Sequence, residues 1–330
     1  MYRGCIFFGY SLLGLVLSVP LAAQDDSCLR RTLSLNIIDS QRRLIRLSDA
    51  SELQGRMAGK PVKILSVKPD QQPHRIVILL DSSGSMFGDA MGHKWKMARF
   101  VAAHIARANL PNTSLALLVF SEKVNEQIDF SQGNSAVVRR LLEIEADTDF
   151  AKKQVRGETA LWDVLLIALQ WLRDPGYVNS VYIITDGGDN KSRNRLRHVR
   201  DDLVSSGVRL YFTLLSSERP MQDEQFGQTE VADLAEATGG LVLGPLGGQP
   251  FGRPSYNPTK DELRGVAIGL NELYSVMTRN DLIEIELPQT LKKWSKWSLG
   301  VSSEQKALHK NWLVVYPQEL APCVAAPSSH

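Results

Sequence analysis

The stretch Ile76-Val77-Ile78-Leu79-Leu80 is followed directly by Asp81-Ser82-Ser83-Gly84-Ser85. The first part is an uninterrupted apolar run, which predicts a strand buried on both faces of a sheet. The second part places one carboxylate and two hydroxyls at alternating positions, with a glycine for a tight turn. An α/β sheet binds ligands at the carboxyl ends of such strands, and these hard oxygens suit Mg²⁺ or Mn²⁺. Taken alone, the loop is equally consistent with an ordinary serine-rich turn.

The composition is that of a globular protein. The chain has 330 residues, of which 43% are hydrophobic and 22% charged, enough for one large domain and a smaller appendage. Its 38 basic and 36 acidic residues are well mixed and give a net charge of +2. We find neither a nucleic-acid-binding motif nor a glycine-rich phosphate loop, so we expect no nucleic-acid and no nucleotide partner.

Residues 1–23 predict a secretory signal peptide, because Arg3 precedes a largely apolar stretch that ends in small residues before a polar turn. The alternative is an uncleaved anchor helix, which would be the chain's contact with a membrane. We therefore expect a secreted or periplasmic protein of the cell envelope.

Cys28 and Cys323 are the only cysteines that follow the predicted signal peptide. Two cysteines in an exported protein are expected to pair, although two free or intermolecular thiols are the alternative. A disulfide that closes so long a loop would stabilise the fold by about 5 kcal/mol in the chain-entropy model.

The chain divides into three parts after the signal peptide. Residues 24–72 alternate short apolar runs with turn residues and predict a small β segment of edge-type strands. Residues 73–246 alternate strands with amphipathic helices, and a hairpin adds an antiparallel edge strand over 124–130. Residues 247–330 predict a surface loop, a helix and a β segment that packs on the amino-terminal strands. The predicted fold class is α/β, a doubly wound, mostly parallel, Rossmann-like sheet with a small β appendage.

The main domain has a regular order of predicted elements. We expect strands at 75–80, 115–120, 181–185 and 208–215, and helices at 90–108, 134–144, 160–173, 193–206, 229–238 and 260–275. Met91 and Trp95 fall on the apolar stripe of the first helix, so we interpret them as packing residues.

Two further loops carry oxygen ligands. The expected strand at 181–185 ends in Asp186-Gly187-Gly188-Asp189, and Thr159 stands at the start of a predicted helix. Read separately, Thr159 is most simply a helix N-cap and Asp186 a turn residue.

In the order Asp-x-Ser-x-Ser, Thr, Asp-Gly, these loops resemble the metal-ion-dependent adhesion site of the von Willebrand factor type A family over about residues 74–246. The resemblance implies hydroxyl ligands from Ser83, Ser85 and Thr159, and carboxylates that act directly or through water from Asp81 and Asp186. It implies Mg²⁺, with Mn²⁺ or Ca²⁺ as alternatives, and an open position that a partner protein's carboxylate fills. Two carboxylates offset a divalent cation, and neutral hydroxyls leave it attractive to another acidic oxygen.

A narrower resemblance concerns the segments outside the main domain. Residues 37–45 and 59–62, together with Tyr316-Pro317, are similar to segments of exported type A proteins of acidobacteria. Gly188 stands where such proteins commonly have an acidic residue.

Three residues are candidates for a partner-contact rim around the site, namely Arg156, Glu158 and Gly188. The simpler interpretation is a solvated charge for Arg156 and helix-end electrostatics for Glu158. The neighbouring Trp162 is most simply a core residue.

Enzyme hypotheses fit the same loop poorly. A haloacid dehalogenase-type enzyme would need an aspartate at position 83, and a serine hydrolase would need glycines that flank the serine. The six histidines are scattered and show no metal-ligand spacing. The sequence therefore predicts an exported, non-enzymatic protein-binding or adhesion module. The alternatives are a scaffold that keeps the fold without using the metal, and a metal-dependent hydrolase.

Overall fold

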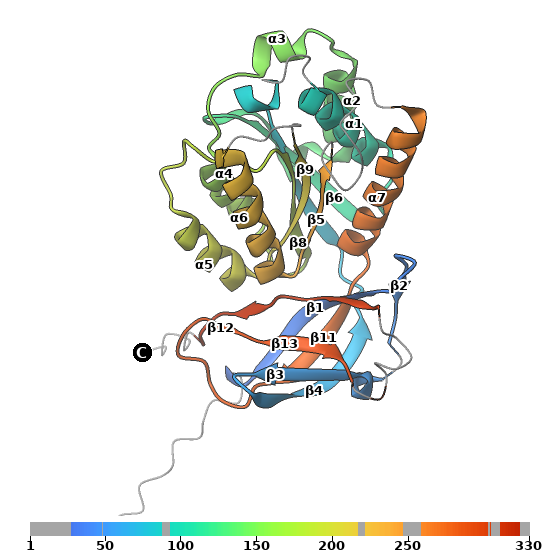
Figure 1. The fold of residues 1–330 in the computed structure, drawn as a ribbon, viewed down its shortest axis with the longest axis vertical. Helices are drawn as coiled ribbons and strands as arrows, with labels where there is room; N and C mark the ends of the chain where they lie inside the picture. The colour runs from blue at the N-terminus through green and yellow to red at the C-terminus, as the bar shows by residue number, and fades with distance from the viewer. Residues whose placement is uncertain are drawn as a thin grey trace, which may run out of the picture.

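The computed structural model describes residues 28–47, 49–87, 93–216, 222–246, 259–302, 304 and 311–323. The predicted signal peptide, Met91 and the loop expected from 247 to 258 lie outside these ranges. Figure 1 shows a helix-covered sheet beside a smaller, strand-rich unit. No helix in the described part of the chain combines the length and the apolar composition needed to cross a bilayer.

The larger sheet runs through the middle of the helix-covered unit. Its described strands have the order β10-β9-β8-β5-β6-β7. Neighbouring strands pair in parallel except at β7, which pairs antiparallel with β6. The strands are β5 (His74–Asp81), β6 (Thr113–Phe120), β7 (Val124–Ile128), β8 (Val178–Thr185), β9 (Arg209–Leu215) and β10 (Leu241–Leu246). This arrangement confirms the predicted doubly wound sheet with an antiparallel edge strand.

Helices cover both faces of this sheet (Figure 1). One face is covered by α1 (His93–Arg107), α2 (Asn134–Ala146) and α7 (Lys260–Thr278). The other is covered by α4 (Leu161–Trp171), α5 (Leu196–Ser206) and α6 (Gln222–Thr238). A short helix, α3 (Phe150–Gln154), follows α2, and Trp95 of α1 stacks on Phe150 at a ring-centroid distance of 5.4 Å. Trp95 is therefore a packing residue, as predicted.

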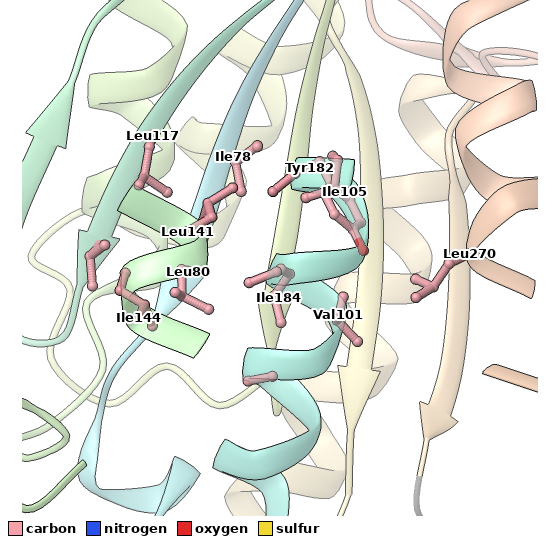
Figure 2. Packing of buried hydrophobic residues seen from close by; sticks show 14 of the residues in the cluster. Ile78, Leu80, Val101, Ile105, Leu117, Leu141, Ile144, Tyr182, Ile184 and Leu270 are labelled. Carbon is pink, nitrogen blue, oxygen red and sulfur yellow. The ribbon is translucent and has the colours of Figure 1, made fainter. Parts of the chain in front are cut away.

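The apolar run of β5 supplies both cores because side chains alternate along a strand. Ile76, Ile78 and Leu80 point to the α1 and α2 side, whereas Val77 and Leu79 point to the α4 side. Figure 2 shows the first of these cores, where helix residues meet strand residues: Ile78, Leu80, Val101, Ile105, Leu117, Leu141, Ile144, Tyr182 and Ile184. The centre of the sheet is therefore buried on both faces.

Some elements differ from the sequence prediction. The helix α6 begins at Gln222, whereas the predicted start was 229. The prediction missed the first turns because they are polar and show no apolar period. The strand β10 was not predicted, since Gly244 and Pro245 lie within it and both disfavour strands. It nevertheless pairs in parallel with β9.

The smaller unit joins the two ends of the chain. Its larger sheet has the order β13-β3-β4-β11-β1-β14, with β2 also paired to β1. The strands are β1 (Arg30–Ile38), β2 (Leu44–Ile45), β3 (Leu53–Met57), β4 (Lys60–Pro69), β11 (Asp281–Glu286), β13 (Ser298–Val301) and β14 (Leu313–Val315), and β12 (Ser295–Lys296) pairs separately with β15 (Glu319–Leu320). The carboxyl-terminal strands therefore pair with the amino-terminal ones, as predicted.

The expectation of edge-type strands was wrong for β1 and β4. Each has partners on both sides: β4 lies between β3 and β11, and β1 lies between β11 and β14. Their apolar residues face a core that includes Leu35, Ile37 and Val62, while polar residues alternate on the other face. An interior antiparallel strand with one solvent-exposed face alternates apolar and polar residues just as an edge strand does. The sequence therefore could not distinguish the two.

Buried polar contacts join the two units. Arg209 of β9 donates to the carbonyl of Gly239 at 2.7 Å and to Oδ1 of Asn36 in β1 at 2.6 Å. Asn36 in turn donates to the carbonyl of Arg279 at 2.6 Å, directly between α7 and β11. Because the guanidinium is buried, it depends on these oxygens for its hydrogen bonds.

Cys28 and Cys323 form the predicted disulfide, with their Cα atoms 5.5 Å apart. We expect the double substitution Cys28→Ser, Cys323→Ser to lower the free energy of unfolding by about 2 to 5 kcal/mol, because the unfolded chain regains the freedom that the closed loop removed. Urea unfolding monitored by circular dichroism measures this difference. An unchanged unfolding midpoint would contradict the stabilising role, and wild-type protein under reducing conditions is the control.

Candidate functional site

The candidate site lies at the carboxyl ends of the neighbouring strands β5 and β8. After β5 the chain crosses through α1 to β6 on one side, and after β8 it crosses through α5 to β9 on the other. The strand order therefore reverses between β5 and β8, and open α/β sheets bind ligands at such a point. Asp81 ends β5 and Asp186 follows β8, and they are 0% and 1% exposed. Two carboxylates thus lie side by side out of solvent.

The first loop presents its oxygens as a compact group. The backbone N–H of Ser83 donates to Oδ1 of Asp81 at 2.8 Å, which turns the chain so that the Oγ atoms of Ser83 and Ser85 lie 3.0 Å apart. Thr185 of β8 donates from its hydroxyl to Oδ2 of Asp81 at 2.6 Å and accepts from the N–H of Gly187 at 3.1 Å. These bonds fix the carboxylate of Asp81 and connect the two strand ends.

The second loop is attached to the first through its backbone. The N–H of Gly84 donates to the carbonyl of Gly157 at 2.9 Å, and the N–H of Arg156 donates to the carbonyl of Ser82 at 3.0 Å. A Cβ on Gly84 would lie 3.2 Å from the Gly157 oxygen, so the glycine permits this close approach. The pairing holds the segment that contains Thr159 beside the serine loop.

Thr159 is buried but is not the N-cap of α4, so that interpretation was wrong. The helix begins at Leu161 with Ala160 as its N-cap residue, which places Thr159 before the cap. Its backbone bonds instead to the third loop: the N–H donates to Oδ1 of Asn190 at 2.8 Å, and the carbonyl accepts from the N–H groups of Asn190 and Lys191. The Thr159 hydroxyl is therefore not occupied in capping the helix.

Close packing against α6 supports the loop that carries Asp186. A Cβ on Gly227 would lie 1.9 Å from the carbonyl oxygen of Gly187, and Gly187 itself has a φ of +91°. Both positions therefore require glycine, the first for space and the second for backbone conformation. This contact fixes the direction in which the chain leaves β8.

Burial and a neighbouring carboxylate perturb the protonation of Asp81. Burial, followed by the charge of Asp186, raises the pKa of Asp81 to about 7, while hydrogen bonds from Thr185 and Ser83 act in the opposite direction. A carboxyl group of this kind binds a proton readily near neutral pH unless a cation replaces it.

Lys94 of α1 supplies one positive charge to this group. Its Nζ lies 2.8 Å from Oδ2 of Asp186, and the two side chains are 4% and 2% exposed. The sequence prediction did not include this lysine. Its signal was nevertheless present, because Lys94 shares the buried face of the helix with Ala98, Val101 and Ile105 at steps of four, three and four. A lysine on an apolar helix face requires a partner.

The donor set fits a hard divalent cation. Two carboxylates and the hydroxyls of Ser83, Ser85 and Thr159 supply only oxygen, and the single charge of Lys94 does not balance both carboxylates. A second kind of metal site consists of three or more His, Cys, Asp or Glu side chains. The described residues contain no such group that could hold a metal ion.

The residues around the site differ in their exposure and contacts. Arg156 is exposed, and Trp162 is buried in the α4 core, as the simpler interpretation predicted. Glu158 forms an ion pair with Lys191 at 2.6 Å. Gly188 is partly exposed beside Asp186, so it leaves the rim open there.

The chain is similar to known proteins over part of its length. Residues 76–188 match the sequence profile of the von Willebrand factor type A domain. No protein of curated function matches the sequence significantly.

Similar solved structures share little sequence with the chain. They include the conserved hypothetical protein BatB from Bacteroides thetaiotaomicron, at 12% identity and a TM-score of 0.43, with 61% of this chain and 98% of that chain covered. A von Willebrand factor type A protein from Catenulispora acidiphila has 12% identity and a TM-score of 0.45, with 89% and 73% covered. The pilus adhesin SpaC from Lactobacillus rhamnosus GG has 9% identity and a TM-score of 0.43, with 76% and 46% covered.

The profile match spans β5 to the Asp186 loop, the part of the chain that builds the site. Over this part, the helix-covered unit is similar to a von Willebrand factor type A domain.

The raised pKa of Asp81 predicts how stability depends on pH when divalent ions are removed. The folded carboxyl holds its proton more tightly than the unfolded one, so stability should fall as pH rises from about 4 to about 7. A rise from 3.8 to about 7 corresponds to at most about 4 kcal/mol. Urea unfolding in chelator at pH 5 and pH 8 measures the loss. Asp81→Asn should show a smaller loss, and an equal loss in both proteins would contradict the assignment to Asp81.

Proposed function

We propose that this protein is an exported, non-enzymatic binding module that holds a divalent cation, most simply Mg²⁺, and captures an acidic residue of a partner protein. The observation that carries the proposal is the meeting of three loops around two fully buried carboxylates, Asp81 and Asp186. The ligands would be the side-chain oxygens of Asp81, Ser83, Ser85, Thr159 and Asp186.

The arrangement suits capture of a carboxylate better than permanent enclosure of a metal. When bound, the metal would supply a positive charge and a coordination position for an outside oxygen. Three of the five proposed ligands are neutral hydroxyls, so the protein itself does not saturate that charge. The partly exposed Ser85 and Gly188 lie on the side that a partner can approach.

An exported location agrees with the disulfide. Cys28 and Cys323 pair in the structure, and such bonds persist mainly in oxidising compartments. We infer that the predicted signal peptide directs the chain across the membrane. The likeness to acidobacterial exported proteins belongs to the same proposal.

The metal proposal predicts a stabilisation that depends on Ser83. Millimolar Mg²⁺ or Mn²⁺ should raise the melting temperature of chelator-treated wild-type protein by about 5 to 10 °C, if the ion is present at about 100 times its Kd. Ser83→Ala should lose most of this shift.

Ser82→Ala is the matched control for this measurement. Its hydroxyl is also buried, but it donates to the carbonyl of Phe120 at 2.8 Å and accepts from Asn125. This variant should be less stable than wild type yet keep the metal-induced shift. A wild-type melting temperature that does not respond to either ion would refute the proposal.

Partner capture is tested separately from metal binding. Extracts of the native envelope are passed over the immobilised protein with Mg²⁺ or with chelator. We expect a protein that binds only in Mg²⁺ and that fails to bind Thr159→Ala. Binding that survives both the chelator and the substitution would show that the metal is not the point of contact.

One observation favours a second candidate, a scaffold that keeps this fold without using a metal. The ammonium group of Lys94 already neutralises Asp186 from within the chain. In that case the melting temperature would be the same in Mg²⁺ and in chelator, and Ser83→Ala would leave partner binding intact.

A further inference from the structure

The ion pair between Lys94 and Asp186 lies inside the proposed metal site. Lys94 comes from α1, 92 residues before Asp186 in the sequence, and its Nζ lies 2.8 Å from Oδ2 of that carboxylate. Both side chains are almost fully buried, so neither charge is screened by solvent. Any cation that uses Asp186 therefore has to share this carboxylate with the lysine.

The charges of the site can be counted from these residues. Asp81 and Asp186 contribute two negative charges when ionised, and Lys94 contributes one positive charge. A divalent cation would change the net charge of these three buried side chains from −1 to +1. Without Lys94, the net charge of the site would change from −2 to zero. The lysine thus opposes entry of the metal and leaves the occupied site with a positive charge.

We propose that Lys94 is a built-in cation that weakens metal binding and strengthens capture of an anionic ligand by the metal-bound site. The inference rests on the proposed function, since it concerns the same metal and the same partner carboxylate. In the metal-free site, the ammonium group of Lys94 competes with the metal for Oδ2 of Asp186. In the metal-bound site, it supplies the positive charge that the incoming carboxylate neutralises.

A purely structural salt bridge would behave differently. Removal of one partner of a buried ion pair leaves the other without compensation and destabilises the fold. If Lys94 only held α1 against the Asp186 loop, its removal would loosen the site and weaken both metal and anion binding. Our proposal instead requires the two affinities to change in opposite directions.

The experiment compares Lys94→Met and Lys94→Gln with the wild-type protein. Met removes the charge and the hydrogen bond, whereas Gln removes the charge and keeps a donor. Lys96→Met is the matched control, because Lys96 is exposed on the same helix. Free Mn²⁺ is measured by electron paramagnetic resonance during titration of chelator-treated protein, first in chloride and then in acetate as a simple carboxylate.

We expect both Lys94 variants to bind Mn²⁺ at least about tenfold more tightly than wild type in chloride, because a competing charge about 3 Å from a ligand oxygen has been removed. Acetate should tighten Mn²⁺ binding to wild type, since two ligands that favour each other do so reciprocally. This effect of acetate should be smaller in both variants and unchanged in Lys96→Met.

The results separate failure of this inference from failure of the proposed function. If wild-type protein binds no Mn²⁺, the proposed function falls and the role of Lys94 falls with it. If wild type binds Mn²⁺ and the Lys94 variants bind it equally or more weakly, only the inference about Lys94 is overturned. Variants that fold only with Mn²⁺ present would support the inference, because the metal then replaces the missing charge. Variants that fail to fold even with Mn²⁺ would show a structural role and would contradict it.

Discussion

The parallel pairing of β5 with β8 at the centre of the sheet is the constraint on which the rest of the site depends. Because the strand order reverses there, the chain leaves the two strand ends in opposite directions, as it does at the ligand-binding point of open α/β sheets. Asp81 and Asp186 stand at those ends with almost no exposure to solvent. Two buried negative charges are unfavourable unless protons or cations compensate them. Lys94 compensates one of the two charges, and a divalent cation would bring the group to a net charge of +1.

Much of the fold and part of the site could be predicted from the sequence for local reasons. The apolar run before Asp81 identifies a doubly buried strand, and the alternation of strands with helices identifies the doubly wound sheet. Asp81, Ser83 and Asp186 could be proposed because each lies at the carboxyl end of such a strand or in the loop that follows it. The strands β1 and β4 were wrongly predicted to be edge strands. A strand with one solvent-exposed face has the same sequence pattern whether or not both its edges are paired.

The remaining features depend on contacts between distant segments. Read alone, Thr159 looked like a helix cap, and only the family resemblance made it a candidate ligand; in the structure its backbone is held by Asn190 from the third loop. Thr185 reaches Asp81 across a separation of 104 residues, and Lys94 reaches Asp186 across 92. No hydrophobic period or residue spacing in the sequence predicts such pairs. Only the apolar face on which Lys94 lies indicates that a buried partner must exist.

The central claim is that Asp81 and Asp186 hold one divalent cation together with Ser83, Ser85 and Thr159. The most direct test is a crystal structure of Mn²⁺-soaked protein with anomalous diffraction data collected at the manganese absorption edge. We expect an anomalous peak between these five side chains, within about 2 to 2.5 Å of the oxygens that bind directly. A map without a peak at the ends of β5 and β8, although Mn²⁺ is bound elsewhere on the protein, would contradict it.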